Sequence, residues 1–131
     1  MFATRQAPVT LTTPAHPSFV RVARLVCASL AADLDFDVDE IQDVSIAVDE
    51  IVNVVVQTAD PGSEMQISMS TDGQVIEVDA QAPTTKLVAE LDPLSEQVLA
   101  AVTDSFEVFV ADGIVAVRMR SAPGGADRGS G

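Results

Sequence analysis

The spacing of apolar residues along the chain predicts three helices. Between residues 18 and 32 apolar side chains recur every three or four positions, as on one side of an amphipathic helix. A second such segment starts at Asp37, which with Glu40 has the spacing of a capping box, and ends at Asp60-Pro61-Gly62. The third predicted helix begins at Asp92-Pro93. The positions predicted to face the core are Phe19, Val22, Ala23, Val26 and Leu30 in the first helix, Ile41, Val44, Val48, Ile51 and Val55 in the second, and Leu94, Val98, Leu99 and Val102 in the third.

Elsewhere the apolar period is two, which is typical of strands. Asp72-Gly73 and Asp112-Gly113 are the turns expected in β-hairpins. The predicted strands are Val9 to Thr12, Met65 to Met69, Val75 to Val78, Phe106 to Val110 and Ile114 to Met119, with residues 81–90 as a connecting stretch. The order strand, helix, helix, hairpin, helix, hairpin predicts an α/β two-layer sandwich, a mixed and mostly antiparallel sheet with helices on one face.

The chain is long enough for one domain. Its hydrophobic content of 47% suffices for a single core, and its length of 131 residues is too short for two ordinary domains. We therefore expect a tail at residues 1–8, a folded domain at 9–120, and a disordered, Gly-rich tail at 121–131.

Acidic residues dominate the charge. Twenty Asp and Glu against seven Lys and Arg give a formal net charge of −13, and no basic residue lies between Arg24 and Lys86. This balance argues against direct nucleic-acid binding and against anionic membrane surfaces, because both need clustered basic residues. The N-terminus lacks the apolar core of a signal peptide, and no apolar stretch is long enough to span a bilayer. We expect a cytoplasmic protein.

The sequence predicts no metal site. Cys27 is the only cysteine and lies in an apolar run, so we expect a small buried side chain rather than a zinc ligand. His16 is the only histidine and lies between two prolines, without partners for a metal or a catalytic triad. The alternating acids from Asp33 to Asp39 lack the Gly and Glu of a calcium loop at the required spacing.

Three polar residues of the second helix are candidates for chemistry. Asp49 and Glu50 lie four and three positions before Asn53, so we expect the three to share one flank of the helix. A carboxylate and an amide there could meet a metal-bound phosphate. A hydrated helix edge explains the same spacing, and from spacing alone it is the more common outcome.

The same region carries a family resemblance. Its motifs are Ser18-Phe19-x-Arg21-Val22, Phe36, Asp39-Glu40-Ile41-x-Asp43 and Ile46-Ala47-Val48-x-Glu50, and a looser match extends to Arg120. These residues resemble the anti-sigma-factor serine kinases of the histidine-kinase-like (GHKL) ATPase superfamily. The resemblance implies the two-layer α/β sandwich that the order of helices and strands also predicts. It also implies that the protein forms a homodimer.

The nucleotide-binding motifs of that family are degenerate here. The glutamate that activates the attacking hydroxyl falls on Glu50, but the magnesium-binding Asn falls on Val54, with Asn53 one position away. The family's Asp-x-Gly-x-Gly falls on Asp79-Ala80-Gln81-Ala82-Pro83, which keeps only the adenine-binding Asp. A Cβ at those glycine positions would block a phosphate from the backbone. We expect no cofactor. The alternative is that the degenerate site still binds Mg-ATP, with Asp79 and Asn53 as the remaining cofactor-binding residues and Glu50 as the catalytic residue.

The resemblance implies an anti-sigma factor that sequesters a stress-response type of sigma factor and is countered by an anti-anti-sigma protein. Arg21 matches the family's partner-contacting arginine, and Arg24 follows one turn later; for both, a solvated helix surface is the alternative. The acidic residues 33–50 could compete for a basic DNA-binding surface of the sigma factor. Two other functions stay open: an active serine/threonine kinase of the anti-anti-sigma protein with Glu50 as base, and a pseudo-kinase adaptor for another partner.

Overall fold

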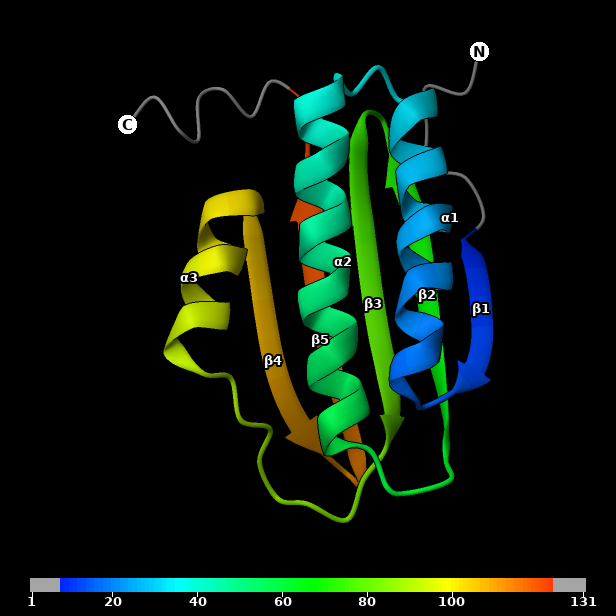
Figure 1. The fold of residues 1–131 in the computed structure, drawn as a ribbon, viewed down its shortest axis with the longest axis vertical. Coiled ribbons are helices and arrows are strands. Elements are labelled where there is room, and N and C mark those ends of the chain that lie inside the picture. Colours follow the sequence, from blue (N-terminus) through cyan, green and yellow to red (C-terminus); the bar gives the residue numbers. More distant parts are fainter. Residues whose placement is uncertain (1–7, 124–131) are drawn as a thin grey trace.

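The computed structural model describes residues 8–123 and consists of one sheet and one layer of helices (Figure 1). The predicted tails at 1–8 and 121–131 lie mostly outside this range, although Ser121 is the last residue of a strand. The elements in chain order are β1 (Val9–Pro14), a 3₁₀ turn (Pro17–Phe19), α1 (Val20–Asp33), α2 (Val38–Thr58), β2 (Glu64–Asp72), β3 (Val75–Pro83), α3 (Pro93–Val102), β4 (Ser105–Ala111) and β5 (Ile114–Ser121).

The five strands form a single sheet in the order β1-β2-β3-β5-β4. All four strand pairings among the described residues are antiparallel, so the parallel pair that a mixed sheet would contain is not formed there. The three helices cover one face, with α2 between α1 and α3 (Figure 1). The predicted two-layer α/β sandwich is therefore confirmed. No helix within residues 8–123 is both long and apolar enough to cross a membrane.

Local sequence signals set several boundaries as predicted. Asp37 caps α2 by accepting a hydrogen bond from the backbone N–H of Glu40 at 2.8 Å, and the Glu40 side chain accepts one from the backbone N–H of Asp37 at 2.9 Å. This is the capping box that their spacing indicated. In the last hairpin Asp112 and Gly113 have φ of 56° and 77°, and the two positive values match a two-residue hairpin turn.

The core lies between α2 and the sheet. On α2, four of the five predicted core positions are buried, and Ile41 is half-buried at the start of the helix. The strands contribute alternate residues to the same core, which follows from the two-residue period. The buried residues of α2 from the prediction are Val44, Val48, Ile51 and Val55, and those of the central strands are Met65, Ile67, Met69, Ile76, Val78, Ala80, Ala82, Val115, Val117 and Met119.

Two sequence predictions about the core and one about a strand boundary were wrong. The buried residues of α1 are Ala23, Cys27 and Ala31, whereas Val22 is 42% exposed. Leu94 is 70% exposed in the first turn of α3. β3 continues to Pro83, five residues beyond the predicted end at Val78.

Candidate functional site

Glu50 and Asp49 lie on different flanks of α2. Asp49 accepts a hydrogen bond from Arg24 of α1, whose Nη1 lies 2.9 Å from Asp49 Oδ2, so Asp49 faces α1. Consecutive helical residues are about 100° apart, and the neighbours of Glu50 one turn away, Ala47 and Val54, are both buried. The predicted shared flank of Asp49, Glu50 and Asn53 is therefore not formed: Asp49 is held by Arg24, and Glu50 lies on the flank away from α1.

Val54 occupies the position where the resemblance expects a magnesium-binding Asn. Its side chain is 5% exposed and belongs to the apolar core. Asn53 is half-buried, and it lies about 100° around the helix from Val54. The amide of Asn53 is thus turned away from the position a magnesium ligand would need beside Glu50.

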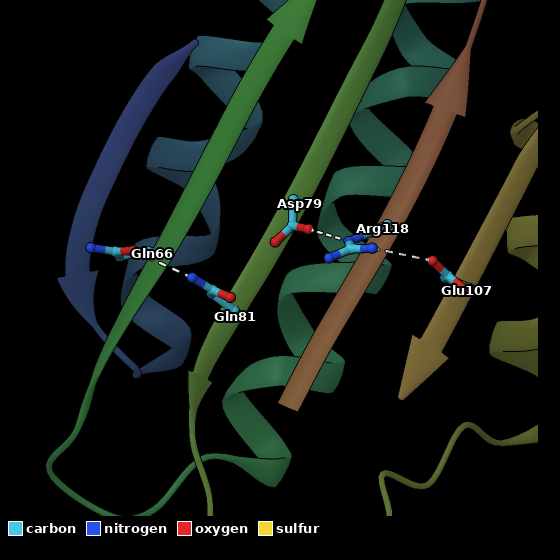
Figure 2. Close-up of polar contacts among 5 residues, drawn as sticks. All are labelled: Gln66, Asp79, Gln81, Glu107 and Arg118. Atoms are coloured by element: carbon cyan, nitrogen blue, oxygen red, sulfur yellow. Dashed lines mark hydrogen bonds and ion pairs between the residues drawn. The ribbon is translucent and has the colours of Figure 1, made fainter. Parts of the chain in front are cut away.

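Asp79 lies on the opposite face of the sheet from Glu50 and Asn53. In β3 the residues before and after it, Val78 and Ala80, are buried against the helices, so the intervening Asp79 points to the face that no helix covers. In Figure 2 the side chains of Asp79, Arg118 and Glu107 lie on the near side of the sheet, and the helices lie behind the sheet. The structure therefore does not bring Asp79 together with Glu50 and Asn53, and one nucleotide pocket containing all three is not formed.

Asp79 takes part instead in a row of ion pairs across three strands. Arg118 Nε lies 2.6 Å from Asp79 Oδ2, and Arg118 Nη1 lies 3.5 Å from Glu107 Oε1 (Figure 2). The hydrogen bond and the charge of Asp79 raise the pKa of Arg118, and Glu107 adds to this in the same direction. Arg120 forms a similar pair with Glu77 at 3.0 Å. These residues line a hollow of about 360 Å³ on the open face.

The segment that would carry phosphate-binding glycines is part of a regular strand. Gln81 pairs with Gln66 of β2 and with Ala116 of β5, so the backbone at this position is within the sheet on both sides. The Gln81 amide Nε2 also lies 3.4 Å from Gln66 Oε1 on the open face (Figure 2). A backbone fixed in two ladders leaves no loop to wrap a phosphate.

The connection between β3 and α3 closes over the end of α2. Thr84 donates to the carbonyl of Thr58 at 2.6 Å, and the Lys86 ammonium donates to the carbonyl of Gln57 at 2.9 Å. A positive group there also offsets the negative end of the helix dipole. A cavity of about 440 Å³ lies at this place, lined by Gln57, Thr58, Lys86, Leu87, Val88 and Glu90. None of Glu50, Asn53 and Asp79 lines it.

These arrangements do not fit a bound magnesium nucleotide. The ligand position holds a buried Val54, the glycine positions lie in a strand, and Asp79 faces away from the helices. Within residues 8–123, no three His, Cys, Asp or Glu side chains gather where they could hold a metal ion. His16 has a local role, because its Nδ1 accepts the backbone N–H of Ser18 at 3.1 Å and caps the 3₁₀ turn.

The outer surface of α1 presents an arginine beside apolar side chains. Arg21 is exposed and forms no ion pair within residues 8–123. Leu25, one turn later, is 59% exposed and therefore lies next to Arg21 on the helix surface. Arg24 differs, because it is half-buried and bound to Asp49. Leu25 was not among the predicted site residues, although its i+4 spacing from Arg21 places the two side by side on a helix.

Comparison with known proteins identifies a shared fold. No protein-family model matches the sequence, and no curated protein matches it. Among solved structures, the chain is similar to the RsbU and RsbW domains of Rv1364c from Mycobacterium tuberculosis, with a TM-score of 0.70 and 14% sequence identity. The match covers 89% of this chain and 32% of that one, so this chain spans about a third of its neighbour. At this level of identity the likeness shows a shared fold, and it agrees with the two-layer α/β sandwich that the sequence predicted.

Proposed function

We propose that the protein is an anti-sigma factor that binds an alternative, stress-response type of sigma factor and is displaced by an anti-anti-sigma protein. The observation that carries the proposal is the exposed Arg21, at the position matching the family's partner-contacting arginine, on a chain with an RsbW-like fold. An exposed arginine is suited to a protein partner because Arg is enriched among the residues that dominate binding free energy at interfaces, and the exposed Leu25 adds apolar area beside it. Sigma factors act in the cytoplasm, where the proposal places this protein.

The proposal also holds that nucleotide binding is lost. Val54 and the strand positions Gln81 and Pro83 support it, because neither a magnesium ligand nor a phosphate-binding loop is present at these places. Without magnesium to neutralise charge, a triphosphate would be repelled by a chain of net charge −13. Isothermal titration calorimetry with Mg-ATP should give no binding heat. Micromolar binding that disappears in the Asp79→Asn variant would restore the kinase alternative.

The partner test uses a pair of variants with the same change in charge. Candidate sigma factors from the native host are first identified by co-purification, and their affinity for the purified protein is then measured. Arg21→Glu should weaken binding by at least tenfold, whereas Lys86→Glu, at the C-terminal end of α2, should bind as the wild type does. Circular dichroism confirms that both variants are folded. Equal affinity of wild type and Arg21→Glu for the sigma factor contradicts the proposal.

Co-purification also separates the proposal from a pseudo-kinase adaptor. A native partner that is neither a sigma factor nor an anti-anti-sigma protein would favour the adaptor. By the same resemblance we propose that the protein is a homodimer, a state that sedimentation measures directly.

A further inference from the structure

The open face of the sheet carries charged side chains that are sorted by strand. The helices of residues 8–123 all lie on the other face (Figure 1). On the open face β3 contributes the carboxylates of Glu77 and Asp79, and the neighbouring β5 contributes the guanidinium groups of Arg118 and Arg120. Asp79 lies opposite Arg118 in the ladder, and Glu77 lies opposite Arg120. A negative row therefore lies beside a positive row, one strand spacing of about 4.8 Å away.

Serine side chains border both rows. On the negative side two serines of β2, Ser68 and Ser70, lie opposite the carboxylates of β3. On the positive side Ser105 of β4 lies opposite Arg120. These serines and the charged side chains line the hollow of about 360 Å³, a volume within the range of small-molecule sites. The hollow is thus bounded by carboxylates and hydroxyls on one side and by guanidinium groups and a hydroxyl on the other.

Asp79 offers a fixed hydrogen-bond acceptor on the negative side. It is paired with Arg118, which is itself held by Glu107 and by the ring of Phe109, whose centre lies 5.2 Å from the guanidinium carbon. In Figure 2 the second carboxylate oxygen of Asp79 is turned away from Arg118, toward β2. An oriented carboxylate oxygen of this kind can accept a hydrogen bond from an ammonium group.

Arg120 offers donors on the positive side. Its Nε lies 3.0 Å from Glu77 Oε2, and its side chain is 52% exposed. A guanidinium has five N–H donors, so a pair through Nε leaves donors on the terminal nitrogens for an anionic group. Ser105, opposite Arg120, is also exposed and adds a hydroxyl donor.

This arrangement favours a ligand that carries both signs of charge. A simple anion would be repelled by the carboxylates of this face and by a chain of net charge −13. A simple cation would compete with Arg118 and Arg120 for carboxylates that these arginines already neutralise. A neutral molecule with an ammonium group at one end and a carboxylate at the other avoids both penalties.

We propose that the hollow binds an extended zwitterion, with its ammonium group at Asp79 beside the β2 serines and its carboxylate at Arg120 beside Ser105. The two charges of the ligand are separated by one to two strand spacings, roughly 5–10 Å. ω-Amino acids and short peptides with free ends have this chemistry. The site lies on the face of the sheet opposite to α1, so it does not depend on the proposed binding of a sigma factor by Arg21.

The test compares three ligands with the same carbon chain. 6-Aminohexanoate carries both charges, whereas hexylammonium and hexanoate carry one each. Titration followed by NMR should shift the backbone amides of Ser68 and Ser105 with 6-aminohexanoate, with a dissociation constant on the order of 1 mM because exposed ion pairs are weak. Each single-charge ligand should bind at least tenfold more weakly. Triglycine distinguishes the two sources: an affinity at least threefold above that of 6-aminohexanoate assigns the site to short peptides, and a lower one assigns it to ω-amino acids.

Substitutions on the two sides of the hollow locate the site. Asp79→Asn and Arg120→Gln should each raise the dissociation constant for 6-aminohexanoate at least fivefold, whereas Lys86→Gln, at the C-terminal end of α2, should leave it within twofold of wild type. Circular dichroism confirms the fold, and the ligand comparison on the wild type does not depend on either variant. The absence of amide shifts with 6-aminohexanoate, or an equal affinity for hexanoate, would show an ordinary solvated surface and contradict the proposal.

Discussion

Arg24 and Asp49 join the two longest helices across a partly buried ion pair. Arg24 Nη1 lies 2.9 Å from Asp49 Oδ2, and the side chains are 37% and 32% exposed. The second carboxylate oxygen, Asp49 Oδ1, is buried and has no hydrogen-bond partner among residues 8–123. Arg24 therefore compensates a carboxylate that is otherwise only partly solvated.

Removing Arg24 alone should cost more than removing the whole pair. We expect Arg24→Met to lower the free energy of unfolding by about 1 kcal/mol, since it leaves the Asp49 carboxylate without its partner. Arg24→Met/Asp49→Leu should recover most of that loss, because no buried charge is left. Urea denaturation of the wild type, both single variants and the double variant measures the coupling. Strictly additive effects would contradict this account.

The Asp37 cap should contribute measurably to stability. Asp37→Ala removes the acceptor for the Glu40 backbone N–H, and we expect the free energy of unfolding to fall by about 1 kcal/mol. Asp39→Ala is the control, because Asp39 lies in the same first turn but is exposed and does not cap. Its effect should be less than half as large. Equal losses in the two variants would assign the effect to the helix dipole instead.

Cys27 should be chemically inert in the folded protein. Burial raises the pKa of its thiol from 9.0 to about 12, so the reactive thiolate is suppressed. We expect no alkylation by iodoacetamide at pH 8 until a denaturant is added. Rapid labelling of the folded protein would show that α1 opens from the core.

The same pKa shift makes stability depend on pH. Above pH 9 the thiol ionises in the unfolded chain but stays protonated in the fold, so the free energy of unfolding falls as pH rises toward 12. Full ionisation of one such group gives a slope of about 1.4 kcal/mol per pH unit. Cys27→Ala should show a shallower slope over this window in alkaline urea denaturation. Identical slopes in the two proteins would rule out this contribution.

The acidic residues of the α1–α2 connection should speed association with a basic partner. Asp35 and Asp39 are exposed, and long-range attraction acts mainly on the association rate. Asp35→Asn/Asp39→Asn should lower the association rate for the sigma factor severalfold at low salt and leave the dissociation rate unchanged. Glu90→Gln/Glu96→Gln, near and on α3, is the matched control. Surface plasmon resonance at two salt concentrations measures both rates.

Most of the fold could be predicted because its signals are local. The Asp37 capping box, the Asp112-Gly113 turn and the switch from helical to strand period each act within a few residues. The exposure of Val22 could not be predicted in this way. Ala23 is buried as its spacing indicated, whereas Val22, the apolar residue next to it, is 42% exposed.

The candidate site was less predictable because it joins residues that are distant in sequence. Motif alignment placed Asp79 and Glu50 in one site, yet the alternation of Val78, Asp79 and Ala80 already put the carboxylate opposite the core. The period of two was thus the better guide to which face Asp79 occupies. The pairing of Arg24 with Asp49 spans 25 positions and had no local signal.

The regular pairing of β3 through Pro83 limits what one substitution can change in this strand. Gln81→Gly alone would not create a phosphate-binding loop, because residue 81 would still be hydrogen-bonded into strands on both sides. A loop here would require the strand to shorten, and a nucleotide site would also require a polar residue in place of Val54 and a carboxylate on the helix side of the sheet. The chain is therefore several coordinated changes away from a nucleotide site at this place.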